Sequence, residues 1–100
     1  MVQGVVELER GKKLEQVLHS KGRIKILIIL AKEGELNISG IARMAKVNHN
    51  STSFHLNFLT EAGILQEKRF GRIRIYRFMV EKPRVKAIKN LIDIWEADSL

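Results

Sequence analysis

The chain has 100 residues, 45% of them hydrophobic and 29% charged, which indicates one globular domain rather than a disordered segment. Its 18 Lys and Arg residues against 11 Asp and Glu residues give a net charge of +7, which favours nucleic acid, before an anionic membrane surface, as a partner. The absence of cysteine excludes disulfides, thiolate metal sites and cysteine nucleophiles. No apolar run reaches membrane-spanning length, and residues 1–10 lack the apolar core of a signal peptide, so we expect a soluble cytoplasmic protein with no membrane partner.

The first third of the chain predicts two helices and a short strand. Apolar spacing over residues 5–20 predicts a helix, most clearly from about Lys12, and Lys21-Gly22 is expected to end it. Residues 23–33 predict a second helix that is apolar enough to be buried on most sides, and Gly34 is expected to stop it. Residues 36–38 are expected to form a strand of a small sheet.

Residues 39–62 show the pattern of two short helices joined by a tight turn. Ser39 is expected to cap a helix over 40–46, residues 47–49 form the turn, and a second helix runs over 50–62 until Gly63 closes it. The hydroxyl of Thr52 is expected to bond back to the turn. The side chains expected to face inward are Ile41, Ala42, Met44, Ala45, Val47, Thr52, Leu56 and Leu59.

The exposed side of this second helix carries polar side chains rather than a Lys/Glu mixture. Asn can pair with adenine and Ser with a base or a phosphate, and a helix N-terminus offers free N–H groups to phosphate. Helix capping is an equal alternative for each serine. The candidate DNA contacts around this helix are Lys46, Asn48, His49, Asn50, Ser51, Ser53, Phe54 and Asn57.

Three further side chains of this helix are ambiguous. His55 is expected to be a hydrogen-bonded histidine at the boundary of the core. Phe54 and Phe58 point away from the packed face. They are open to three interpretations: contact with thymine methyl groups, packing against a partner subunit, or cover beneath the N-terminal segment.

Residues 64–70 and 73–78 predict two strands joined through Gly71. Five basic residues and one acidic residue lie over 66–77, which predicts a wing that grips phosphates or enters a minor groove. The alternative is a basic edge hairpin that its charge protects from aggregation. The candidate contacts of the wing are Lys68, Arg69, Arg72 and Arg74.

Because side chains alternate along a strand, Arg72 and Arg74 share one face and Ile73 and Ile75 share the other. We expect the isoleucines to face inward and the arginines outward.

Pro83 is expected to open a final helix over 83–97, where its missing N–H costs nothing. Its apolar stripe either completes the core or forms a two-fold interface, and a dimer is favoured because two-fold proteins match two-fold operators. The predicted interface residues are Leu14, Val17, Val85, Ile88, Leu91, Ile92 and Trp95.

No catalytic or metal site is predicted. The pairs His49–Ser51 and His55–Ser53 lack an acidic residue to orient the imidazole, and the histidines do not have metal-ligand spacing. We therefore expect neither an enzyme nor a bound cofactor.

Residues 23–78 resemble a winged helix-turn-helix of the ArsR-like kind, with MarR-like domains as near neighbours. The resemblance rests on residues 22–27, 38–42, 51–65 and 71–76, followed by a terminal helix. The expected fold is α+β, mostly α, in the order α-α-β-α-α-β-β-α. Residues 1–100 would form a single domain with a DNA-reading core over 23–78 and a dimerisation helix over 83–97.

The resemblance implies that the helix near Asn50 enters the major groove, the wing touches the minor groove or backbone, and the terminal helices form a homodimer. Metal-sensing members carry cysteines that this chain lacks, so that route of sensing is not implied. The predicted function is sequence-specific regulation of transcription on double-stranded DNA. The alternatives are an architectural DNA-binding protein of low specificity and a winged-helix protein-interaction module. The operator, the effector, the sign of regulation and the source organism stay open. The high Ile and Lys content and the absence of cysteine are taken as a sign of a thermophile, and the resemblance extends to archaeal members of the family.

Overall fold

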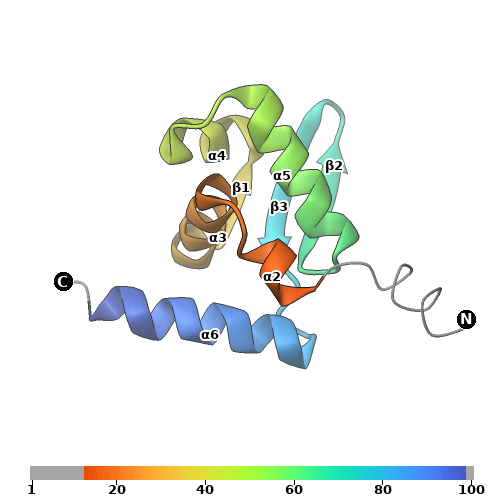
Figure 1. Ribbon diagram of the computed structural model, residues 1–100. Coiled ribbons are helices and arrows are strands. Elements are labelled where there is room, and N and C mark those ends of the chain that lie inside the picture. Colours follow the sequence, from red (N-terminus) through yellow and green to blue (C-terminus); the bar gives the residue numbers. More distant parts are fainter. Residues whose placement is uncertain (1–12, 99–100) are drawn as a thin grey trace, which may run out of the picture.

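The computed structural model describes residues 13–98, and its elements follow the predicted order (Figure 1). The fold is α+β and mostly helical. Within the described range, no helix is both long and apolar enough to cross a membrane. The elements are α2 (Leu14–Val17), α3 (Lys21–Glu33), β1 (Glu35–Asn37), α4 (Ile38–Ala45), α5 (His49–Glu61), β2 (Leu65–Phe70), β3 (Ile73–Phe78) and α6 (Pro83–Ala97).

The boundary between the first two helices differs from the prediction. Helix α2 has a single turn, and residues 5–12 of the predicted helix lie outside the described range. Ser20 Oγ accepts a hydrogen bond from the N–H of Arg23 at 3.2 Å, so Ser20 caps α3. Lys21 and Gly22, predicted to end the preceding helix, therefore form the first turn of α3.

Asparagine side chains begin both helices of the helix-turn-helix. Asn37 Oδ1 accepts from the N–H of Gly40 at 2.7 Å, so α4 begins at Ile38 and the predicted Ser39 cap is wrong. The strand β1 consequently ends one residue earlier than predicted. Asn and Ser cap equally well, so residue type could not separate two candidates that lie two positions apart.

Asn48 plays the same part for α5. Its Oδ1 accepts from the N–H of Ser51 at 2.8 Å, and His49 becomes the first residue of the helix instead of the last of the turn. Lys46 has a left-handed φ of 57° and ends α4. The turn therefore occupies residues 46–48, one residue earlier than predicted.

The sheet has the order β1-β3-β2 and is antiparallel throughout. Phe70 pairs with Ile73 across the tip, where Gly71 has a φ of +62°, a conformation that glycine adopts without strain. At the other end, Leu65 pairs with Phe78 in the core. The hairpin is thus anchored at one end and free at its tip.

The two faces of β3 are the reverse of the prediction. Tyr76 and Phe78 are buried, so alternation places Arg74 on their face, toward the core. Ile73, predicted to face inward, is 52% exposed. Sequence alternation defines two faces but does not say which one the helices cover.

Helices α3, α4, α5 and α6 surround one core; α3, α4 and α6 pack against β3, and α5 packs against β2 (Figure 1). Met44, predicted to face inward, is exposed at the surface of α4. The core side chains are Val17, Ile26, Leu27, Leu30, Ala31, Ile38, Ile41, Ala45, Leu56, Leu59, Ala62, Ile64, Leu65, Tyr76, Phe78 and Val85.

Candidate nucleic-acid interface

Helix α5 has a fully buried face and a fully exposed one. Thr52, Leu56 and Leu59 are completely buried against the neighbouring elements. The Thr52 hydroxyl donates to the carbonyl of Val47 at 3.3 Å, which confirms its predicted bond to the turn. The opposite face consists of Asn50, Phe54 and Asn57, all exposed, which we call the α5 stripe.

The turn between α4 and α5 adds polar groups to the beginning of this stripe. Lys46, Asn48 and His49 are exposed, whereas Ser51 and Ser53 are half-buried. Asn48 Oδ1 accepts the helix N–H, while the amide NH₂ of Asn48 takes no part in the cap and can donate to a ligand. The structure thus brings the predicted helix contacts together but gives Asn48 a capping role as well.

Sequence reasoning missed Arg23, which is buried to 5% exposure between α2, α3 and α5. Its guanidinium lies 3.7 Å from the ring centroid of Phe58 and donates from Nη1 to the carbonyl of Gln16. Its Nε donates to Nδ1 of His55 at 3.2 Å. Arg23 therefore ties the inner flank of α5 to α2, and the apolar pattern around it in the sequence carried no signal for this.

His55 is held neutral by these contacts. Nδ1 accepts from Arg23, so the imidazole proton is assigned to Nε2, which lies 3.4 Å from Ser20 Oγ. Burial, and then the charge of Arg23, lower the pKa of His55 below its usual value. Burial also lowers the pKa of Arg23. The prediction of a hydrogen-bonded boundary histidine is confirmed.

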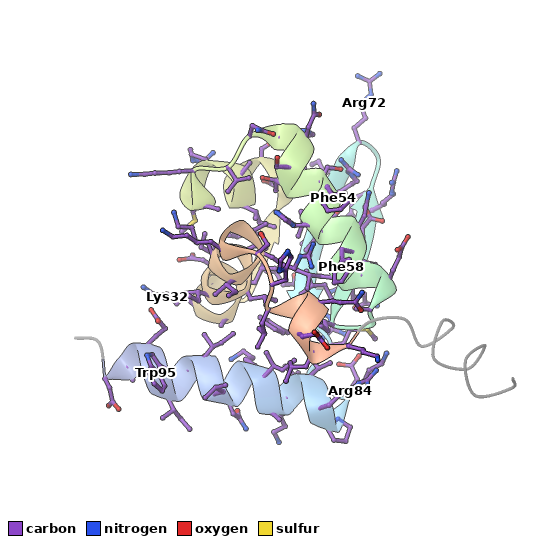
Figure 2. The ribbon with its side chains drawn as sticks, viewed as in Figure 1. Lys32, Phe54, Phe58, Arg72, Arg84 and Trp95 are labelled. Carbon is purple, nitrogen blue, oxygen red and sulfur yellow. The ribbon has the colours of Figure 1, made fainter. Side chains whose placement is uncertain are left out.

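The two phenylalanines of α5 have different surroundings (Figure 2). Phe58 is half-buried and covers the guanidinium of Arg23 on α3. Phe54 is 63% exposed, and its ring meets the His55 ring edge-on with centroids 5.7 Å apart. Only Phe54 is available to a ligand of the α5 stripe.

The inner face of the wing, residues 65–78, centres on Glu67. Tyr76 donates its hydroxyl to Glu67 Oε2 at 2.8 Å, and the two carboxylate oxygens lie 3.6 Å from Arg69 Nε and 3.8 Å from Arg74 Nη1. Burial, and then the hydrogen bond to Glu67, raise the pKa of Tyr76 to about 12. Glu67 thus holds two of the predicted wing contacts in place and offsets part of their charge.

Arg72 is the most projecting cation of the wing. It extends from the hairpin tip, at the end of the molecule where α5 begins (Figure 2). Lys68 Nζ instead forms an ion pair with Glu35 at 2.9 Å on the outer face of the sheet. Among residues 13–98, Arg72 has no ion-pair partner, so its charge is fully available to an anionic ligand.

The predicted dimer residues divide into two groups, and two of the predictions need correction. Val17 and Val85 are buried in the core of a single chain and cannot contact a partner. Ile88 and Ile92 are half-buried, whereas Leu14, Leu91 and Trp95 are exposed.

Exposed apolar side chains on α6 include Ile94, which sequence reasoning omitted. An open apolar groove of about 460 Å³ lies beside this surface. It is lined by Leu14, Leu18, Ile24, Leu27, Ile28, Ala87, Ile88, Leu91, Ile92, Trp95 and Glu96.

No metal-binding arrangement occurs within residues 13–98, where no three His, Asp or Glu side chains are grouped to hold an ion. Both ring nitrogens of His55 are engaged, by Ser20 and by Arg23.

The sequence over residues 20–67 matches the family described as bacterial regulatory protein, arsR family. The arsenic resistance transcriptional regulator ArsR1 of Pseudomonas putida is 34% identical over 73 residues, which cover 71% of this chain and 57% of that protein. An uncharacterised HTH-type transcriptional regulator of Methanocaldococcus jannaschii is 32% identical over 89 residues, 86% of this chain and 98% of that protein. The chain therefore spans little more than half of the Pseudomonas relative.

Solved structures have the same fold. The AntR antimony-specific transcriptional repressor superposes with a TM-score of 0.68 at 27% identity, covering 99% of this chain and 84% of that one. A homodimeric winged helix-turn-helix DNA-binding domain from Mycobacterium bovis superposes with a TM-score of 0.69 at 23% identity, covering 99% and 86%.

Proposed function

Because the chain belongs to the ArsR family of helix-turn-helix transcription regulators, we propose that it binds double-stranded DNA sequence-specifically as a homodimer. Helix α5 enters the major groove, and the wing contacts the backbone and the adjacent minor groove. Family membership places the chain among regulators rather than enzymes. Its proposed site of action is the cytoplasm and, if the source is a prokaryote, the nucleoid.

The observation that carries this proposal is that Arg72 projects from the wing tip at the end of the molecule where α5 begins (Figure 2). Polar side chains at the start of α5, which suit base edges, and a cation that suits phosphate thus lie at the same end. Lys46 and His49 lie at the beginning of α5 and extend this surface.

Salt dependence tests the electrostatic part. With about six to ten phosphate contacts per dimer, affinity for duplex DNA should fall by roughly 10³ to 10⁵ between about 50 and 200 mM salt. Fluorescence anisotropy on labelled host genomic fragments measures this. Constant affinity over that range would contradict the proposal and favour a protein-interaction module. Equal affinity for all fragments, with the expected salt dependence, would favour an architectural DNA-binding protein.

For the homodimer, we propose that a second copy covers the exposed apolar surface of α2 and α6. The support is its apolar character, with Trp95 70% exposed, and its place away from the hairpin tip and the beginning of α5 (Figure 1). The likeness to a homodimeric winged helix-turn-helix domain agrees with this arrangement.

Sedimentation of Leu91→Glu tests the interface, because a buried unpaired carboxylate opposes association. The variant should sediment as a monomer, while the parent and the control Val80→Glu, which lies in the turn before α6, should sediment as dimers. A dimeric Leu91→Glu protein would place the interface elsewhere.

A further inference from the structure

The α5 stripe lacks the side chains that most often read guanine. Helix α5, from His49 to Glu61, contains no lysine or arginine. Those two residues make the commonest specific base contact in the major groove, because their N–H groups match the O6 and N7 acceptors of guanine. The positive charge of the interface lies outside this helix, in Lys46 and the wing.

The side chains that the stripe does present suit A·T base pairs. The amides of Asn50 and Asn57 can bond bidentately to N6 and N7 of adenine. The ring of Phe54, which lies between them along the helix, can make an apolar contact with the C5 methyl group of thymine. These three residues lie on one face because they are spaced by four and three positions along the helix.

Phe54 is exposed without serving the core. Its ring rests edge-on against His55, which is itself fixed by Arg23 and Ser20. A positioned ring with 63% of the residue exposed leaves apolar surface that binding can remove from water. Phe58, one turn further along, already covers Arg23 and is not free in this way.

We propose that α5 reads A·T base pairs. The Phe54 ring lies against a thymine methyl group, and the amides of Asn50 and Asn57 bond to adenines on either side of that contact. This inference rests on the proposed function and assigns the base composition of the half-site.

Selection from a random pool of duplexes tests the composition. With duplexes of about 30 base pairs, which hold two half-sites one helical turn apart, the retained sequences should carry A·T pairs where footprinting places α5. The thymines of the selected site are then replaced by deoxyuridine one at a time, which removes only the C5 methyl group of that base. One position in each half-site should respond, and a single replacement there should lower affinity about four-fold, the equivalent of about 0.8 kcal/mol for one buried methyl-sized group.

The Phe54→Ala variant should bind the thymine and deoxyuridine duplexes equally. Phe70→Ala is the matched control, because this wing phenylalanine is 61% exposed but does not lie on α5, and it should keep the four-fold difference. Half-sites rich in G·C, or parent protein insensitive to every deoxyuridine, would overturn the inference while leaving DNA binding intact. A pool that yields no enriched sequence would instead contradict sequence-specific binding itself.

Discussion

Helix α5 and the wing divide the proposed interface between two kinds of chemistry. The exposed stripe of α5 offers amides and an aromatic ring and has no cation, whereas the wing contains five basic residues and only Glu67 as an acid. Base-edge contacts discriminate between sequences, and phosphate contacts bind all sequences alike. Under the proposed function, discrimination and overall affinity belong to different elements, so separate substitutions should change them independently.

The two elements also differ in how they are held. Helix α5 is fixed on its inner side by the core and on its flank by Arg23 and His55. The wing is fixed at its core end by Tyr76 and Glu67, while Arg72 projects from a free tip. Base recognition requires more exact geometry than phosphate contact does. This fits the firmer support of α5, the helix proposed to contact bases, compared with the wing tip that carries Arg72.

The largest expected effect comes from the buried side of α5. Leu56→Ala should lower the free energy of unfolding by about 2–5 kcal/mol, because it leaves a cavity at a fully buried site. Urea denaturation measures it. Asn57→Ala, the next residue but exposed, should stay within about 0.5 kcal/mol of the parent. Equal stability of the two variants would remove the distinction between the faces of α5.

A smaller effect is expected on the reading side. Asn50→Ala should lose about 1–3 kcal/mol of binding free energy per half-site of the selected site, because its adenine contact is lost, and little on an unrelated duplex. Competition anisotropy with both duplexes measures the difference. If both affinities fell together, Asn50 would belong with the phosphate contacts, and the separation between helix and wing would be wrong.

The wing should show the complementary behaviour. Arg72→Ala removes one phosphate contact from each subunit of the dimer. It should weaken binding to every duplex about 30-fold near 150 mM salt and reduce the salt slope by about 1.8, the contribution of two phosphate contacts. Arg84→Ala removes the same charge from α6, away from the wing tip, and should leave the slope unchanged (Figure 2). A loss confined to the selected site would show that Arg72 reads sequence.

The smallest expected effect concerns pH. The pKa of His55 is lowered in the folded chain by burial and then by Arg23, so below the usual value near 6.5 the unfolded chain binds a proton more readily. The stability that this contributes is present above that value and is lost as the pH falls from it through the depressed pKa.

Denaturation at several pH values measures this dependence. His55→Gln should flatten it, while His49→Gln, at the exposed start of α5, should not. If the stability of the His55 variant depended on pH as that of the parent does, other groups would set the pH dependence, and the neutral imidazole would not stabilise the position of α5.

Much of the architecture could be predicted from short-range patterns. The element order follows from apolar periods, from Gly71 at the hairpin tip and from Pro83 at the start of α6, all of which act within a few residues. The bond from Thr52 to the turn was also predictable, because it joins residues five positions apart. Helix starts were less certain, since Asn37 and Ser39 are both good caps.

The sequence by itself determined the class of fold, the presence of a polar helix beside a basic hairpin, and the residue types on each alternating face. The tertiary structure decided which faces are covered: Arg74 turns toward the core side, Ile73 toward solvent, and Val17 and Val85 into the protomer. It also joined Arg23 to His55 across 32 positions, which leaves Phe54 exposed and Phe58 covered. The physical reason is that local propensity depends on neighbours along the chain, whereas burial and charge pairing depend on elements that meet only when the chain has folded.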